Sequence, residues 1–103
     1  MTLSELVDVA IQIEPQCLIV RKNSRQRQYV VPRQMICYFA SQMGYSEETI
    51  AKEIMRDRCT VGYSKQIVID ALTYNNLEYR RVYKEFIKHM KKYPNGDYLD
   101  HLD

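Results

Sequence analysis

The stretch RDRCT at residues 56–60 places side chains of several chemical kinds just before a long amphipathic run. An arginine can donate two hydrogen bonds to guanine, an aspartate can accept one from the cytosine amino group, and a threonine methyl can touch the methyl of thymine. At the start of a helix such side chains can reach base edges in the DNA major groove. The candidate base-reading residues are Arg56, Asp57, Arg58, Cys59 and Thr60. The alternative is that Asp57 only caps the helix and the arginines are solvated.

The cysteines and histidines do not favour an enzyme or a metal site. A catalytic thiol at Cys59 needs a positioned base, and the only histidines are His89 and His101, in the last expected helix and in the tail. Cys17, Cys37 and Cys59 follow one another at gaps of 20 and 22 residues, without a C-x-x-C pair. This spacing argues against a zinc site and a disulfide framework. We therefore expect no catalysis and no cofactor, with Cys17 and Cys37 as small buried apolar residues.

Basic residues are concentrated in two blocks, although the net charge is only +2. Residues 15–44 contain no acid and five cations, which are Arg21, Lys22, Arg25, Arg27 and Arg33. Residues 75–92 contain six lysines and arginines against two glutamates. Basic blocks on a near-neutral body suit an anionic partner, and a merely solvated basic surface is the alternative.

The spacing of apolar residues predicts a compact all-α domain of five or six helices. Leu3, Leu6, Val7, Ala10 and Ile11 share one helical face, and similar stripes recur along the chain. Thr2 or Ser4 can cap the first helix and Ser46 the third, while Gly44 ends the second. The expected helices cover residues 3–13, 29–43, 46–55, 59–74 and 77–93. Residues 15–20 are short and apolar, so a helical turn and a strand are both possible, and we favour the helical turn. Residues 1–93 make the domain, and residues 94–103 form an acidic C-terminal tail.

The short helix at 46–55, the tight turn and the long helix from residue 59 fit a helix-turn-helix. In DNA-bound examples the first turn of the second helix meets the major groove. Helix pairs with short turns are also common in proteins that do not bind DNA.

Three stretches together resemble the C-terminal DNA-binding domain of the bacterial replication initiator DnaA, a Trp-repressor-like helical domain. They are RQRQYVVPRQMICYFA at 25–40, GYSEETIAKEI at 44–54 and RDRCTVGYSKQI at 56–67. The shared features are PRQ at the opening of a helix, S…IA on the short helix, and RD-x-x-TV at the entry to the long helix. The resemblance runs from Leu3 to Leu77.

The resemblance implies roles for particular residues. Arg25 and Arg27 match an arginine-rich loop that reaches the minor groove, and Arg33 and Gln34 match a pair that contacts phosphates. Residues 56–61 match the segment that reads bases. We add Arg21 and Lys22 from the first basic block, and Lys65 of the long helix, as phosphate contacts.

The chain also departs from the family. Arg58 replaces a histidine, Cys59 replaces a threonine, and Ile54 and Met55 stand where two glycines are usual. No G-x-x-x-x-G-K-[ST] motif is present, so no nucleotide partner is expected. The resemblance is to a free-standing DNA-reading module and not to an ATP-driven initiator.

We therefore expect a protein that binds a specific double-stranded DNA sequence, in replication or transcription control, as a monomer or weak dimer. The main alternative is a helical adaptor that binds another protein and no DNA. The N-terminus lacks a basic signal region and no run reaches 18 apolar residues, so we expect no membrane partner and a cytoplasmic location.

Overall fold

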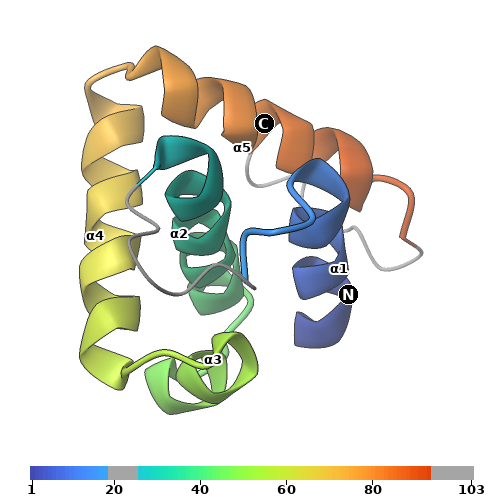
Figure 1. Ribbon diagram of the computed structural model, residues 1–103, viewed down its shortest axis with the longest axis vertical. Helices are drawn as coiled ribbons and strands as arrows, with labels where there is room; N and C mark the ends of the chain where they lie inside the picture. The colour runs from blue at the N-terminus through green and yellow to red at the C-terminus, as the bar shows by residue number, and fades with distance from the viewer. Residues whose placement is uncertain (19–25, 94–103) are drawn as a thin grey trace.

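The computed structural model describes residues 1–18 and 26–93, and within them the chain forms five α-helices and no strand (Figure 1). The helices are α1 (Leu3–Ile13), α2 (Arg27–Gln42), α3 (Glu47–Ile54), α4 (Arg58–Thr73) and α5 (Leu77–Met90). The expected all-α class is confirmed. None of the helices in these residues is long and apolar enough to cross a membrane. The acidic tail at 94–103 and the cations Arg21, Lys22 and Arg25 lie outside the described residues.

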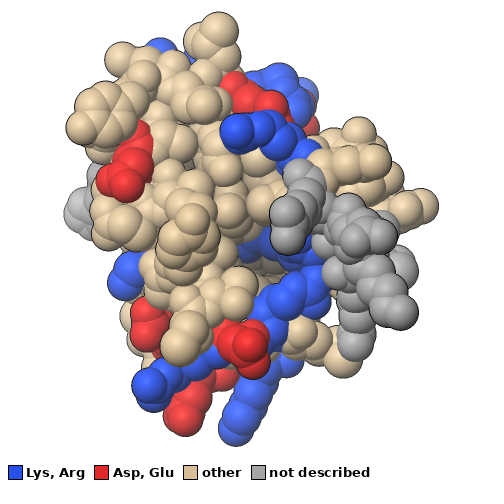
Figure 2. Space-filling view, turned by 60° about the vertical axis from the view of Figure 1, so that its left-hand side comes forward, with Lys and Arg blue, Asp and Glu red and all other residues tan. Residues whose placement is uncertain are grey.

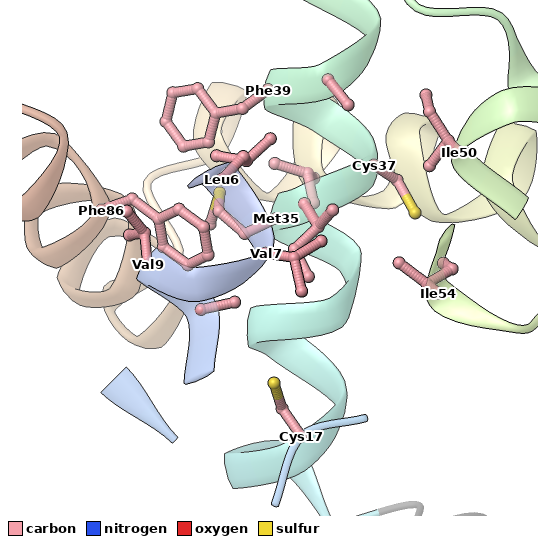
Figure 3. Close-up of a cluster of buried hydrophobic side chains, with 14 of the residues drawn as sticks. Leu6, Val7, Val9, Cys17, Met35, Cys37, Phe39, Ile50, Ile54 and Phe86 are labelled. Atoms are coloured by element: carbon pink, nitrogen blue, oxygen red, sulfur yellow. The ribbon is translucent and has the colours of Figure 1, made fainter. Parts of the chain in front are cut away.

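Helix α2 is the centre of the fold, because it packs against each of the other four helices. Its first turn lies near α5 and its last turn leads into α3, so α3 and α5 occupy opposite ends of the molecule (Figure 1). Figure 3 shows Leu6, Val9, Met35, Phe39 and Phe86 gathered between α1, α2 and α5. The rings of Phe39 and Phe86 are stacked with centroids 5.5 Å apart. This cluster holds α2 in place, and α3 and α4 pack against α2.

Helix α2 begins two residues before the expected start. The carbonyl of Gln26 accepts hydrogen bonds from the amides of Tyr29 and Val30 at 3.0 and 3.1 Å, which closes a first turn upstream of Pro32. Pro32 is therefore the sixth helical residue and not one of the first. Proline has no amide hydrogen, so position 32 donates no helical bond to the carbonyl of Gln28.

Side-chain caps begin three of the helices. Thr2 and Glu5 form a reciprocal capping box at α1, Ser46 accepts from the amide of Thr49 at α3, and Asn76 accepts from two amides at α5. These bonds satisfy first-turn amides that have no partner inside the helix. The expected caps at Thr2 and Ser46 are confirmed. Asp57 holds the N-cap position of α4, but its carboxylate accepts no capping hydrogen bond there.

Helices α2, α3 and α4 end in the same way, with one residue in the left-handed conformation. That residue is Gly44 with φ of 96°, Met55 with φ of 58° and Asn75 with φ of 59°. In each case the following amide donates to the carbonyl five residues earlier, at 2.8 to 3.1 Å. This is the Schellman motif, which favours glycine and accepts asparagine. Met55 is the exception, because its side chain makes the left-handed conformation unfavourable.

The core differs from the expected stripe on α1. Val9 is fully buried, whereas Ile11 is 38% exposed. The reason is that α1 contacts three helices, α2, α3 and α5, so its buried arc is wide. Val9 lies inside this arc and Ile11 lies beyond its edge.

Candidate nucleic-acid interface

Two of the predicted contact stretches meet at one surface pocket. Helices α2 and α4 lie side by side, and a pocket of about 570 Å³ opens between them and the end of α3. Its wall on α2 includes Arg33 and Gln34, and its other walls include Arg56 and Thr60. The remaining lining residues are Val30, Cys37, Ile54, Tyr63 and Ser64. Within residues 1–18 and 26–93, the lining contains two cations and several neutral polar groups but no carboxylate, a composition that suits an anion.

Arg33 and Arg56 bring two positive charges to this pocket. Both side chains are half-buried. Burial, and next the nearby positive charge of Arg56, lower the pKa of Arg33 below its ordinary value. The guanidinium still stays charged at neutral pH, because arginine loses its proton only at very high pH. An anion placed between the two groups would relieve their repulsion, so the pocket favours a phosphate or a carboxylate.

Arg56 is also fixed to the end of α3. Its Nη1 donates to the carbonyl oxygens of Met55 and Ile54, at 3.1 and 3.4 Å. These carbonyls lie at the negative end of the α3 dipole, where a cation is stabilising. The side chain therefore both holds the α3–α4 turn and lines the pocket. Its expected base contact has to be made from this half-buried position.

The floor of the pocket is neutral. Cys37 is 1% exposed, and burial raises the pKa of its thiol to about 12, although a hydrogen bond with the Ser64 side chain acts in the opposite direction. Burial also raises the pKa of Cys17 to about 11, against the charge of Arg33. Both thiols remain protonated at neutral pH and are poor nucleophiles. Figure 3 shows Cys37 directed toward Ile50 and Ile54, which confirms it as a small core residue.

Gln34 and Arg27 are linked through Tyr79 of α5. The Tyr79 hydroxyl donates to Oε1 of Gln34 at 2.6 Å, and Gln34 itself is 9% exposed. The Arg27 guanidinium lies 6.0 Å from the centroid of the Tyr79 ring, within cation–π range. Burial raises the pKa of Tyr79, so its hydroxyl remains a donor. Arg27, expected at the minor groove, thus stands beside α5, outside the pocket between α2 and α4.

The first turn of α4 spreads its side chains over a convex surface. Asp57, Arg58, Cys59 and Thr60 are all exposed. At about 100° per residue, Arg58 shares a flank of the helix with Lys65, whereas Thr60 lies on the opposite flank and faces the pocket. The expected base-reading set is therefore divided between two sides of one protruding helix end.

The Arg58 flank of α4 borders α3. A Cβ at Gly62 would lie 2.6 Å from a carboxylate oxygen of Glu47 in the first turn of α3, so glycine permits this close approach. Lys65 lies on this flank and is half-buried.

Tyr63 is a site residue that the sequence analysis did not assign. Its side chain is 70% exposed although it lines the pocket beside Arg33. The helical periodicity of α4 predicts that the Tyr63 side chain is exposed. Val61 and Val68 mark the buried side, and Tyr63 lies on the far side of the helix from them. An aromatic ring at such a position can contact a sugar or a base.

Figure 2 views the molecule with the α4 side turned forward. Lysine and arginine side chains gather over its lower half, where α3 and α4 meet, and line the lower side of a hollow. Acidic side chains are interspersed among them, so the basic surface is broken and not continuous.

Comparisons with protein-family models, with curated proteins and with solved structures find no match to this chain. The resemblance to the DnaA domain therefore depends on the three sequence stretches alone. Within residues 1–18 and 26–93, no group of three His, Cys, Asp or Glu side chains could hold a metal ion. We infer the function from the charge and shape of the pocket and of the α4 end beside it.

Proposed function

We propose that this protein binds a specific sequence of double-stranded DNA, with α3 and α4 acting as a helix-turn-helix. The observation that carries the proposal is the shared pocket. Arg33 from α2, Arg56 from the α3–α4 turn and Thr60 from α4 line it together, although they come from stretches that are separate in the sequence. A phosphate held by the two arginines would fix α4 against the backbone of the duplex.

In this arrangement the first turn of α4 enters the major groove. A helix is about 10–12 Å across and the groove about 12 Å wide, so one helix end fits. Arg58, Cys59 and Thr60 are exposed at that end, and Arg58 is the strongest candidate to contact a guanine. The α4 amides are not capped by Asp57, which leaves them able to meet a phosphate.

Phosphate contacts flank this centre. Lys65 is placed two helical turns beyond Arg58 on the same flank of α4, about 10 Å along the axis. Gln34 lines the pocket wall, and its amide NH₂ is a donor even while its oxygen accepts from Tyr79. From the sequence resemblance we assign Arg21 and Lys22 to phosphates and Arg25 to the minor groove. Arg27 is not included, because it lies beside Tyr79 of α5.

A selection experiment tests the proposal. The purified chain is incubated with a pool of random duplexes, and bound DNA is recovered, amplified and sequenced over several rounds. We expect enrichment of one common motif and tighter binding to that motif than to a scrambled duplex of the same composition. Absence of any enriched motif, with equal binding to both duplexes, would contradict sequence-specific recognition.

A helical adaptor is the second candidate, and one surface favours it. Tyr74 and Leu77 flank the α4–α5 turn with 82% and 81% of their surface exposed. Exposed apolar side chains that lie together can mark a protein contact. A chain that binds no duplex in the selection, but associates with a partner protein only while Tyr74 and Leu77 are intact, would support the adaptor.

A further inference from the structure

The outer face of α5 carries a row of cations that the proposed helix-turn-helix does not use. Arg80, Arg81, Lys84, Lys88 and Lys91 are all exposed and lie within one arc of the helix; we name these five residues the α5 ridge. From the first to the last, the row is about 16 Å long at 1.5 Å per residue. One DNA strand carries a phosphate about every 3.4 Å of axis, so the row matches roughly five phosphates.

Among the residues that the structure describes, acidic neighbours neutralise little of this ridge. Glu85 lies 3.9 Å from Arg81, and both groups are exposed, so this i,i+4 pair is weak. Glu78 lies at the start of the helix, toward the pocket that Arg27 and Arg81 line. The ridge therefore keeps a net positive charge over most of its length.

A pocket beside the ridge provides more than charge. It has a volume of about 340 Å³ and is lined by Arg80 and Lys84, with the rings of Tyr38 and Tyr83 as walls. Leu72 and Asn75 complete the lining, and Asn75 accepts a hydrogen bond at 3.3 Å from Nη1 of Arg80. The rings of Tyr38 and Tyr83 meet edge to face with centroids 6.4 Å apart. Two cations one helical turn apart over a pocket with phenol groups form a receptor for a phosphate group.

The α5 ridge and the α3–α4 surface face different directions. They lie at opposite ends of α2, whose 16 residues span about 24 Å (Figure 1). Helix α5 packs through its other face on α1, α2 and α4, so the ridge points away from the core. A duplex bound at the first turn of α4 would leave the ridge uncovered.

We propose that the α5 ridge binds the phosphate backbone of a second DNA duplex, so that one copy of the protein bridges two DNA segments. This inference rests on the proposed DNA binding by α3 and α4 and extends it. All five ridge side chains are cations, which suit the phosphates of a DNA backbone, so we expect the second contact to be independent of DNA sequence. One duplex is held by its sequence and the other by its charge.

A capture assay tests the bridge. A duplex that contains the selected motif is fixed to beads, the full chain is added, and a fluorescent duplex of unrelated sequence is supplied at low salt. The unaltered protein should retain the fluorescent duplex on the beads well above the level without protein. The variant Arg80→Gln/Lys84→Gln/Lys88→Gln should bind the fixed duplex with similar affinity and lose most of the retained fluorescence.

A matched control separates the ridge from net charge. The variant Ser4→Glu/Gln12→Glu/Gln16→Glu changes the net charge by the same three units at exposed positions on and just after α1. It should retain the second duplex more strongly than the ridge variant does. Circular dichroism verifies that both variants keep the helical fold.

Each contrary outcome overturns a different statement. If the protein binds neither duplex, the proposed function fails and the bridge fails with it. If it binds the fixed duplex but retains no second duplex, only the bridge is wrong. If the ridge variant retains as much fluorescent duplex as the unaltered protein, the ridge is not the second contact, and two associated copies make the bridge. Binding to phosphatidylglycerol-containing vesicles is measured for the same two proteins. If the ridge variant loses only the binding to vesicles, the ligand of the ridge is a lipid surface and not DNA.

Discussion

The left-handed residue at the end of α3 gives a quantitative prediction about stability. Met55 has φ of 58° and ψ of 48°, and this conformation costs an ordinary L-residue about 1–2 kcal/mol. Glycine avoids that strain but is more flexible in the unfolded chain, which offsets roughly 0.5–1 kcal/mol. The Met55 side chain is 63% exposed, so little burial is lost. We expect Met55→Gly to stabilise the fold by about 0.5–1 kcal/mol.

Thermal unfolding followed by circular dichroism measures this effect. A gain of that size raises the Tm by roughly 2–8 °C in a domain of this length. Asn75→Gly is the matched control, because Asn75 follows α4 with φ of 59° and asparagine tolerates this conformation. The Tm of the Asn75→Gly variant should therefore change less than the Tm of Met55→Gly. A lower Tm for Met55→Gly, or equal shifts in the two variants, would refute the assignment of strain to Met55.

Three further predictions concern buried groups and charge. Tyr79→Phe removes the donor to Gln34 and leaves a nearly buried oxygen unpaired, so the free energy of unfolding should fall by about 1–3 kcal/mol. Urea denaturation measures this loss, and an unchanged midpoint would mean that water replaces the hydroxyl. Burial raises the pKa of Cys37 from 9.0 to about 12 and of Cys17 to about 11, so the folded state binds more protons and stability should fall as pH rises above 9. Each thiol contributes a slope of up to about 1.4 kcal/mol per pH unit, and Cys37→Ala should reduce the measured slope; an unaltered slope would contradict burial of that thiol. DNA affinity should fall with salt with a log–log slope of roughly −4 to −5 if about five phosphates are neutralised, and a flat titration would exclude a phosphate interface.

The helices could be predicted from the sequence because their signals are local. Apolar residues at three- and four-residue spacing, the caps Thr2 and Ser46, and the stop at Gly44 each act within one or two turns. The early start of α2 escaped prediction because Pro32 normally lies in a first turn. Here the Gln26 carbonyl closes an additional turn before it.

The side chains at the candidate site were less predictable, because tertiary packing decides where they lie. The motif resemblance singled out Arg33, Arg56 and Thr60, but no local pattern states that they line one pocket. The link from Tyr79 to Gln34 joins residues 45 positions apart, so it depends on how α5 packs on α2. The exposure of Tyr63 could have been predicted from the sequence, because the helical periodicity of α4 places this residue opposite the buried valines.

The central claim is that the first turn of α4 reads bases while the α2 side of the pocket holds phosphates. Fluorescence anisotropy of the selected duplex and of a scrambled duplex tests it with two variants whose fold is verified by circular dichroism. Arg58→Ala should weaken binding to the selected duplex by about 1–3 kcal/mol and leave the scrambled duplex nearly unaffected. Arg33→Ala should weaken both duplexes by a similar factor and reduce the salt slope by about one. Equal loss on both duplexes for Arg58→Ala, or unchanged binding for both variants, would contradict the claim.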